Sequence, residues 1–173
     1  MMADSVPAGV GSQVFSKYLR FTLFASGVVI LDQLTKMLVL RYLPLHDSVA
    51  VIPGFFSLTH VRNPGGAFGF LAQNDSPLRH WLFLLAAVFA LGMILYLYHQ
   101  TPRSRPFFGF ALALIFGGAI GNLIDRLRFG EVVDFLDVYV GYLHWPTFNM
   151  ADSAVTVGVI IFLLHLVTKK VPL

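Results

Sequence analysis

The sequence predicts an all-α polytopic membrane protein with four transmembrane helices and a small β-rich element in the connection between the first two. Apolar residues make up 57% of the 173 residues and the mean hydropathy is +0.74, which is too hydrophobic for an ordinary soluble domain. Four stretches reach the roughly 20 mostly apolar residues that a spanning helix requires. They are residues 21–40, 80–99, 107–125 and 149–167.

Positive charges orient these predicted helices. Pairs of Lys or Arg residues flank the spans on one side of the membrane: Lys17 and Arg20, Arg103 and Arg105, Lys169 and Lys170. By the positive-inside rule both termini are cytoplasmic, residues 1–20 form a tail, and the long connections 41–79 and 126–148 are extracytoplasmic. Positive charge that is spread along a membrane chain in this way indicates orientation and no nucleic-acid patch.

The sequence lacks the residues or motifs that several types of catalytic, metal and phosphate-binding site require. There is no cysteine, which excludes disulfides, thiolate metal sites and a cysteine nucleophile. The histidines are scattered and no H-E-x-x-H motif occurs, so an intramembrane zinc protease is not indicated. Neither a G-x-S-x-G motif nor a Gly-rich phosphate loop is present. We therefore expect no metal and no cofactor.

Two charged residues interrupt the first predicted span. Asp32 and Lys36 are four positions apart, so on a helix they share one face, with the acid in the favourable N-terminal place for an ion pair. Intramembrane charges usually pair or mark a functional site. The pair either holds helices together or supports a site that other residues build.

The first long connection contains the predicted β element. Residues 55–61 are rich in aromatic and β-branched side chains, the sequence NPGG at 63–66 is typical of a turn, and AFGFL at 67–71 resumes an alternating pattern. A small hairpin or curved β element follows from this pattern. Asn63 either opens the turn or has a functional role.

The third predicted span ends in small and polar residues. Gly117 and Gly121 have the G-x-x-x-G spacing that lets another helix approach closely. Gly118, Asn122 and Asp125 follow one another at steps of four and three, so they share a helical face. Asn122 and Asp125 are thus either part of an interhelical polar network or part of a functional site.

Acidic residues recur around the start of the fourth span. Asp134 and Asp137 would point to opposite faces of a strand but share one face of a helix. Only one of the two acids need be functional, and the spacing does not decide which. Asp152 lies where a helix-start acid is stabilised, and Asn149 can cap that helix. Two carboxylates that converge at an apolar boundary tend to share one proton, as in aspartic proteases.

Five motifs in order give the chain a family resemblance. They are VILDQLTK (29–36), VRNPGGAFGFL (61–71), GNLIDRL (121–127), VVDF (132–135) and FNMADSAVTVG (148–158). Together they resemble lipoprotein signal peptidase, the type II signal peptidase of bacteria, over nearly the whole chain. The resemblance implies an aspartic endopeptidase of the bacterial inner membrane, with its active site near the extracytoplasmic face. Its partners would be membrane lipid and lipidated prolipoproteins, from which it would remove the signal peptide by cutting before the lipidated cysteine.

The resemblance also implies roles for individual residues. The catalytic pair maps onto Asp134 and Asp152, which sets Asp137 aside, and we expect Asp152 to be the ionised member of the pair. Positions that line or support the site map onto Asn63, Gly65, Asn122, Asp125, Arg126, Asn149, Asp32 and Lys36.

Two alternatives remain at this stage. One is a small multipass transporter or assembly factor that uses its intramembrane acids for a proton or ion path. The other is an intramembrane aspartic protease whose substrates carry no lipid.

Overall fold

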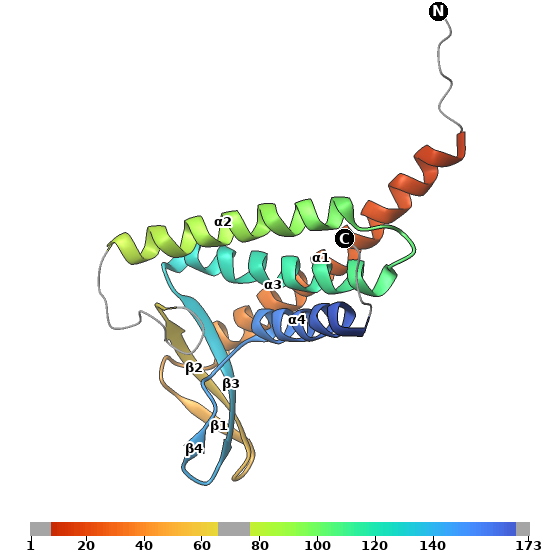
Figure 1. The fold of residues 1–173 in the computed structure, drawn as a ribbon. Helices are drawn as coiled ribbons and strands as arrows, with labels where there is room; N and C mark the ends of the chain where they lie inside the picture. Colours follow the sequence, from red (N-terminus) through yellow and green to blue (C-terminus); the bar gives the residue numbers. More distant parts are fainter. Residues whose placement is uncertain (1–7, 66–76, 169–173) are drawn as a thin grey trace, which may run out of the picture.

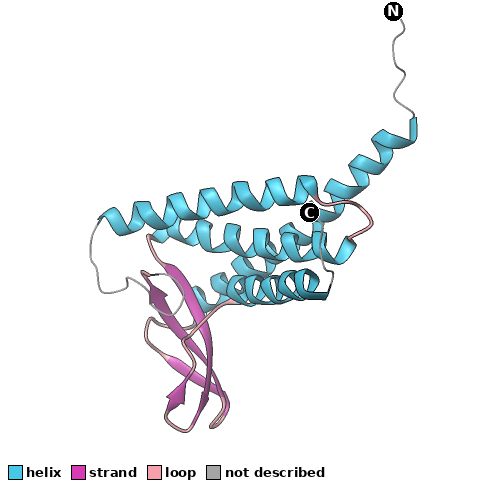
Figure 2. Cartoon of the chain, viewed as in Figure 1, coloured by secondary structure: helices cyan, strands magenta, loops and turns pink. Residues whose placement is uncertain are grey.

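The computed structural model describes residues 8–65 and 77–168, which form four long helices and a small sheet (Figure 1). In chain order the elements are α1 (Ala8–Tyr42), β1 (Ser48–Ile52), β2 (Phe56–Asn63), α2 (Pro77–Gln100), α3 (Pro106–Phe129), β3 (Val132–Val140), β4 (Leu143–His144) and α4 (Met150–Thr168). The helices lie alongside one another, and the sheet projects from one end of the bundle (Figure 2).

All four helices are long and apolar enough to cross a membrane, which confirms the predicted spans. The first helix is longer than predicted, because it begins at Ala8, inside the segment that was expected to be a tail. Residues 8–20 contain no proline, so the helical hydrogen bonds continue unbroken into the apolar span. At the end of the bundle that holds the connection between α2 and α3, α1 therefore extends by more than a turn beyond the predicted span.

The sheet is antiparallel throughout, with the strand order β1-β2-β3-β4. The predicted strand at 55–61 is confirmed as β2, and the sheet is larger than the predicted β element, because β3 and β4 come from the second long connection. Residues 132–140 are rich in β-branched and aromatic side chains that suit a strand. The expected partner at 67–71 lies outside the described residues.

Small residues let α3 pack tightly between α1 and α4. A Cβ atom added at Gly117 would lie 2.7 Å from the carbonyl oxygen of Ala25 on α1, and one at Gly121 would lie 2.5 Å from Oδ2 of Asp32. Gly118 is as closely approached by the backbone of Ala151 on α4. The G-x-x-x-G spacing therefore has the packing role that was predicted, and it draws the polar faces of three helices together.

A hydrophobic cluster joins the sheet to the helices. Val133 and Phe135 on β3 are buried with Val39 of α1, and Leu58 of β2 and Met150 of α4 pack against them. Because successive side chains of a strand point to opposite faces, Asp134 points away from the neighbours that form this cluster. The packing thereby fixes the direction of the Asp134 side chain.

Candidate active site

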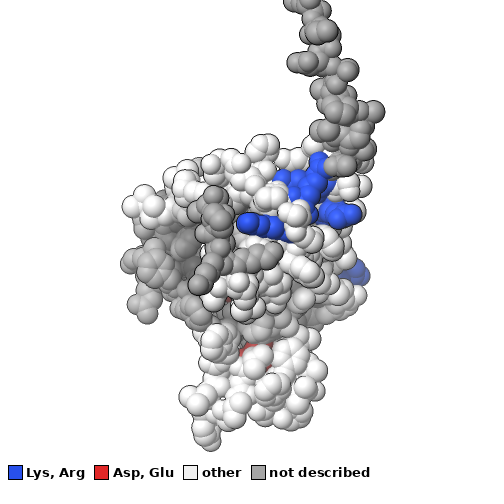
Figure 3. Space-filling view, turned by 45° about the vertical axis from the view of Figure 1, so that its right-hand side comes forward, with Lys and Arg blue, Asp and Glu red and all other residues white. Residues whose placement is uncertain are grey.

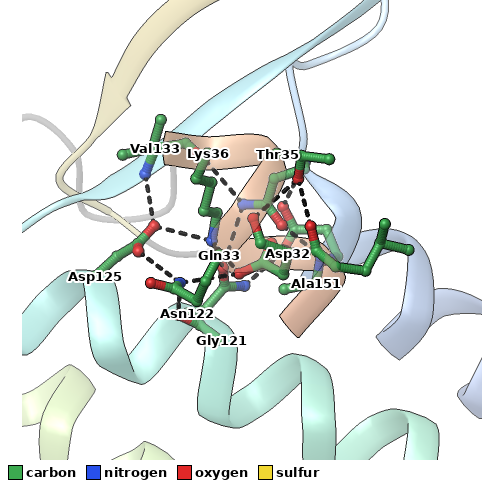
Figure 4. A network of polar contacts seen from close by, with 12 residues as sticks. Asp32, Gln33, Thr35, Lys36, Gly121, Asn122, Asp125, Val133 and Ala151 are labelled. Carbon is green, nitrogen blue, oxygen red and sulfur yellow. Dashed lines mark hydrogen bonds and ion pairs between the residues drawn. The ribbon is translucent and has the colours of Figure 1, made fainter. Parts of the chain in front are cut away.

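A buried ion cluster links α1 to α3 (Figure 4). The Lys36 ammonium lies 2.8 Å from Oδ2 of Asp32 and 2.8 Å from Oδ2 of Asp125, and all three side chains are at most 2% exposed. Lys36 also donates a hydrogen bond of 3.0 Å to Oδ1 of Asn122. The predicted pair of Asp32 and Lys36 is thus present, and it holds helices together while it also contacts the residues of a neighbouring polar site.

The two acids of this ion cluster also accept hydrogen bonds from backbone N–H groups. Ala151 N donates to Oδ1 of Asp32 at 2.9 Å, and Val133 N donates to Oδ2 of Asp125 at 3.1 Å. These donors immediately precede Asp152 and Asp134 in the chain. The ion cluster therefore holds the backbone beside each predicted catalytic residue.

Gln33 belongs to this cluster and was not singled out from the sequence. Its Nε2 donates to Oδ1 of Asp125 at 3.0 Å, and it lies 3.2 Å from both the Gly121 carbonyl and Oδ2 of Asp32. A signal was available, because Gln33 is an amide inside an apolar span and lies between Asp32 and Lys36. Such a group needs a polar partner in the bundle.

The extended conformation of β3 separates Asp134 from Asp137. Asp134 is 2% exposed and accepts hydrogen bonds from Nδ2 of Asn149 at 2.7 Å and from Nδ2 of Asn63 at 3.0 Å. Asp137 instead lies 2.9 Å from Nδ1 of His144 on the adjacent strand. Because β3 is a strand, the two acids point to opposite faces and have different partners.

Asn149 and Asp152 form a reciprocal cap at the start of α4. Asp152 N donates to Oδ1 of Asn149 at 2.9 Å, and Asn149 N donates to Oδ2 of Asp152 at 3.2 Å. This is a capping box with aspartate in the place of glutamate. The other oxygen of Asp152 accepts a hydrogen bond of 2.8 Å from Asn122. The predicted helix-start acid is thus also a member of the polar site.

Backbone pairing brings the start of α4 against β3. Phe148 N donates to the Leu136 carbonyl at 3.1 Å, and the Phe148 carbonyl accepts from Leu136 N at 2.8 Å. Asn149 follows directly and contacts both acids. Asp134 and Asp152, from a strand and a helix, therefore meet at one amide side chain.

Burial and mutual repulsion change the acidity of Asp134. Removal from water and the nearby carboxylate of Asp152 raise the pKa of Asp134 to about 7, while the hydrogen bonds from Asn63 and Asn149 act in the opposite direction. A carboxyl group with this pKa keeps its proton over much of the range below neutral pH. The pair can therefore supply one proton donor and one proton acceptor.

Arg126 connects this site to the turn after β2. Its guanidinium donates to the Gly65 carbonyl at 3.1 Å and lies over the Phe83 ring, 5.2 Å from the ring centroid. Gly65 N in turn donates to Oδ1 of Asn63 at 3.0 Å, which leaves the Asn63 amide group oriented toward Asp134. Asn63 thus makes the contact expected of a residue that opens the turn and also donates to Asp134, while its functional role stays a prediction.

The structure brings eight of the ten predicted site residues into two adjoining polar clusters that share Asn122, and the other two, Arg126 and Gly65, contact each other beside Asn63. One is the ion cluster of Asp32, Lys36 and Asp125, and the other, here called the acid site, contains Asp134, Asp152, Asn149 and Asn63. Among the described residues, no group of three His, Asp or Glu side chains is arranged to hold a metal ion.

Comparison with known proteins places the chain in a family. Residues 24–168 match the family model described as signal peptidase (SPase) II. The lipoprotein signal peptidase of Desulforapulum autotrophicum is 51% identical over 153 residues, which cover 88% of this chain and 94% of the relative. That of Syntrophus aciditrophicus is 45% identical over 150 residues, with 87% and 93% covered.

A solved structure agrees with the sequence relatives. A bacterial membrane enzyme determined by the in meso method at 2.3 Å resolution has a TM-score of 0.78 and 36% sequence identity, with 89% of this chain and 94% of that chain covered. Its overall likeness extends over the four helices and the sheet. The matched motifs, the fold and the extent of the sequence similarity together show that this chain belongs to the signal peptidase II family.

Proposed function

We propose that this protein is the aspartic endopeptidase that removes the signal peptide from diacylglyceryl-modified prolipoproteins by cutting before the lipidated cysteine. Family membership supports the substrate class. One observation carries the aspartic mechanism: Asp134 and Asp152 converge on Asn149. In the described part of the chain neither acid has a cation within salt-bridge distance.

The proposed mechanism divides acid and base between the two carboxyl groups. Ionised Asp152, at the N-terminal end of α4, removes a proton from water, whose oxygen attacks the scissile carbonyl carbon. Protonated Asp134 donates its proton to the carbonyl oxygen. When this tetrahedral gem-diol collapses, the C–N bond breaks, one hydroxyl group returns its proton to Asp134, and the proton taken up by Asp152 passes to the leaving amine. The products are a signal peptide with a new carboxyl group and a lipidated cysteine with a free amine.

The polar side chains around the dyad suit an extended peptide. Unpaired backbone groups cost several kcal/mol in apolar surroundings, so a scissile segment needs polar partners there. Asn63, Asn122 and Arg126 lie beside the two acids and can supply donors and acceptors. The adjacent sheet would act as a cradle for the segment that leaves the membrane.

We place the protein in the bacterial inner membrane with the acid site near the extracytoplasmic face. The sheet and the acid site lie at one end of the helices, and the connection between α2 and α3 lies at the other (Figure 1). Arg103 and Arg105 in that connection mark it as cytoplasmic by the positive-inside rule.

The decisive experiment compares a lipidated and an unlipidated prolipoprotein with the purified protein. We expect cleavage of the lipidated precursor only. Asp134→Asn and Asp152→Asn should each remain folded and lower cleavage by about 10³-fold or more, because each removes a proton-transfer group. Asp137→Asn, an equivalent change on the same strand that points away from the site, should keep most of the activity.

Other outcomes would overturn specific parts of the proposal. Substantial turnover by either dyad variant would refute the aspartic mechanism. Equal cleavage of both precursors would favour the protease of unlipidated substrates. Proton flux through the reconstituted protein without cleavage would favour the transporter, an alternative that the comparisons do not support.

A further inference from the structure

A cavity lies far from the acid site. It has a volume of about 710 Å³ and is formed by the N-terminal half of α1, the C-terminal end of α2 and the start of α3. In Figure 1 this is the end of the helices opposite to the sheet. The reaction proposed above uses none of the side chains that line it.

Cations dominate the polar part of this cavity. Its lining includes Lys17, Arg20, Arg103 and Arg105, and no acidic residue is among the described residues that line it. Figure 3 shows Lys and Arg side chains gathered on this end of the molecule, away from the sheet. Four positive charges around one hollow create a potential that favours an anion.

Lys17 is held in place in the wall of the cavity. Its ammonium donates to the Thr101 carbonyl at 2.8 Å and to the His99 carbonyl at 3.0 Å, and it lies 4.9 Å from the centroid of the Tyr98 ring. These contacts hold the C-terminal end of α2 against α1, and they do not neutralise the positive charge of Lys17. The cavity therefore has a fixed cation in its wall, beside the exposed guanidinium of Arg20.

Aromatic rings form the other wall. Phe24 and Phe110 meet edge to face with centroids 4.8 Å apart, and Phe21 packs on Tyr98 at 4.2 Å. Phe107 and Phe24, which both line the cavity, are 76% and 48% exposed. A surface of this kind, on helices that cross a membrane, faces hydrocarbon, so it suits an acyl chain better than water.

Helix α3 begins at this cavity and adds amide donors. Arg105 occupies the N-cap position and makes no side-chain cap hydrogen bond, and proline follows it. The first N–H groups of a helix have no partner within the helix and favour an anion. They add a second type of anion-binding group to the four cations.

We propose that this cavity binds an anionic phospholipid, with the headgroup phosphate at the cations and an acyl chain along the aromatic wall. Basic pockets between transmembrane helices are suited to anionic headgroups. Free phosphate would use the cations but gain nothing from exposed Phe24 and Phe107. The combination of charge and apolar wall therefore selects a lipid, drawn from the leaflet on the side of the connection between α2 and α3.

The test is native mass spectrometry of the full chain in detergent, supplied with equal amounts of phosphatidylglycerol and phosphatidylcholine. We expect retention of phosphatidylglycerol in preference to phosphatidylcholine. Arg20→Gln should weaken this retention about fivefold, the effect of about one interfacial cation. Arg41→Gln removes another exposed arginine, at the other end of α1, so it is the matched control and should change retention little.

A variant of the aromatic wall and a competition with inorganic phosphate complete the experiment. Phe107→Ala should weaken retention of the lipid, and millimolar inorganic phosphate should not displace it. The proposal is overturned if both lipids are retained equally, if Arg20→Gln and Arg41→Gln have equal effects, or if phosphate displaces the lipid. Unchanged helix content by circular dichroism and unchanged cleavage of the lipidated precursor would show that each variant is folded.

Discussion

Two adjoining pairs of carboxyl groups have different partners in this protein. Asp32 and Asp125 share the ammonium of Lys36, which lies 2.8 Å from each. Asp134 and Asp152 share Asn149, whose side chain and backbone amides donate to them. Asn122 joins the two sets, because its oxygen accepts from Lys36 and its nitrogen donates to Asp152.

The difference shows how one residue type can have two roles within one site. Asp32 and Asp125 each contact the Lys36 ammonium and also accept a backbone hydrogen bond, so they act as fixed acceptors that hold Ala151 and Val133. Amide donors stabilise a carboxylate only partly, so the pKa of Asp134 stays raised to about 7. The first pair is suited to positioning and the second to proton transfer.

The largest expected effect comes from breaking the ion cluster. Lys36→Met should lower the free energy of unfolding by about 3–5 kcal/mol, because it leaves two buried carboxylates without their cation. Thermal unfolding in detergent measures this loss. The variant Asp32→Asn, Lys36→Met, Asp125→Asn removes all three charges and should recover much of the stability. Wild-type stability in Lys36→Met would contradict the assigned role of the cation.

At the acid site, we expect a substitution to raise the free energy of unfolding instead of lowering it. Asp134 binds its proton more tightly in the folded protein, with a pKa of about 7, than in the unfolded chain, with 3.8, so its carboxyl group costs stability as the pH rises between these values. Asp134→Asn removes the ionisable group, so the variant does not lose this stability as the pH rises. Relative to the wild type it should gain up to about 4 kcal/mol between pH 4 and pH 8. A stability difference that does not change with pH would contradict the raised pKa.

A smaller effect is expected where α3 touches the ion cluster. Gly121→Ala places a methyl group 2.5 Å from Oδ2 of Asp32, which should destabilise the protein by about 1–3 kcal/mol. Gly92→Ala, on a part of α2 with nothing within 4 Å of the added atom, is the matched control and should be neutral or stabilising. Equal melting temperatures for the two variants would show that α1 and α3 can separate without loss.

The smallest effect concerns the tuning of Asp134. The hydrogen bond from Asn63 lowers the pKa of this group, so Asn63→Ala should raise it. Loss of Asp134's proton should produce the alkaline limb of kcat/KM, and this limb should move up by about half to one pH unit. Thr59→Ala, on the same strand but away from the acid, should leave it in place. A shift to lower pH would refute this account.

Much of the architecture could be predicted from local pattern. Hydropathy predicted the four spans, the spacing of Asp32 and Lys36 predicted their ion pair, and the small residues of α3 predicted its close packing. The sheet was predicted only in part, because β3 pairs with β2 across two helices and the register of such a pair depends on the packed whole. The catalytic role of Asp134 and Asp152 stays a prediction.

The sequence by itself determined which groups are present: four apolar helices, a set of acids and amides beside them, and one lysine inside the first span. The tertiary structure decided which acid has which partner. Asp125 receives the Lys36 ammonium because Gly121 lets α1 and α3 come close, whereas Asp134 receives amides because the pairing of Phe148 with β3 delivers Asn149 to it. These contacts join distant parts of the chain, so they exist only once helices and strands have packed.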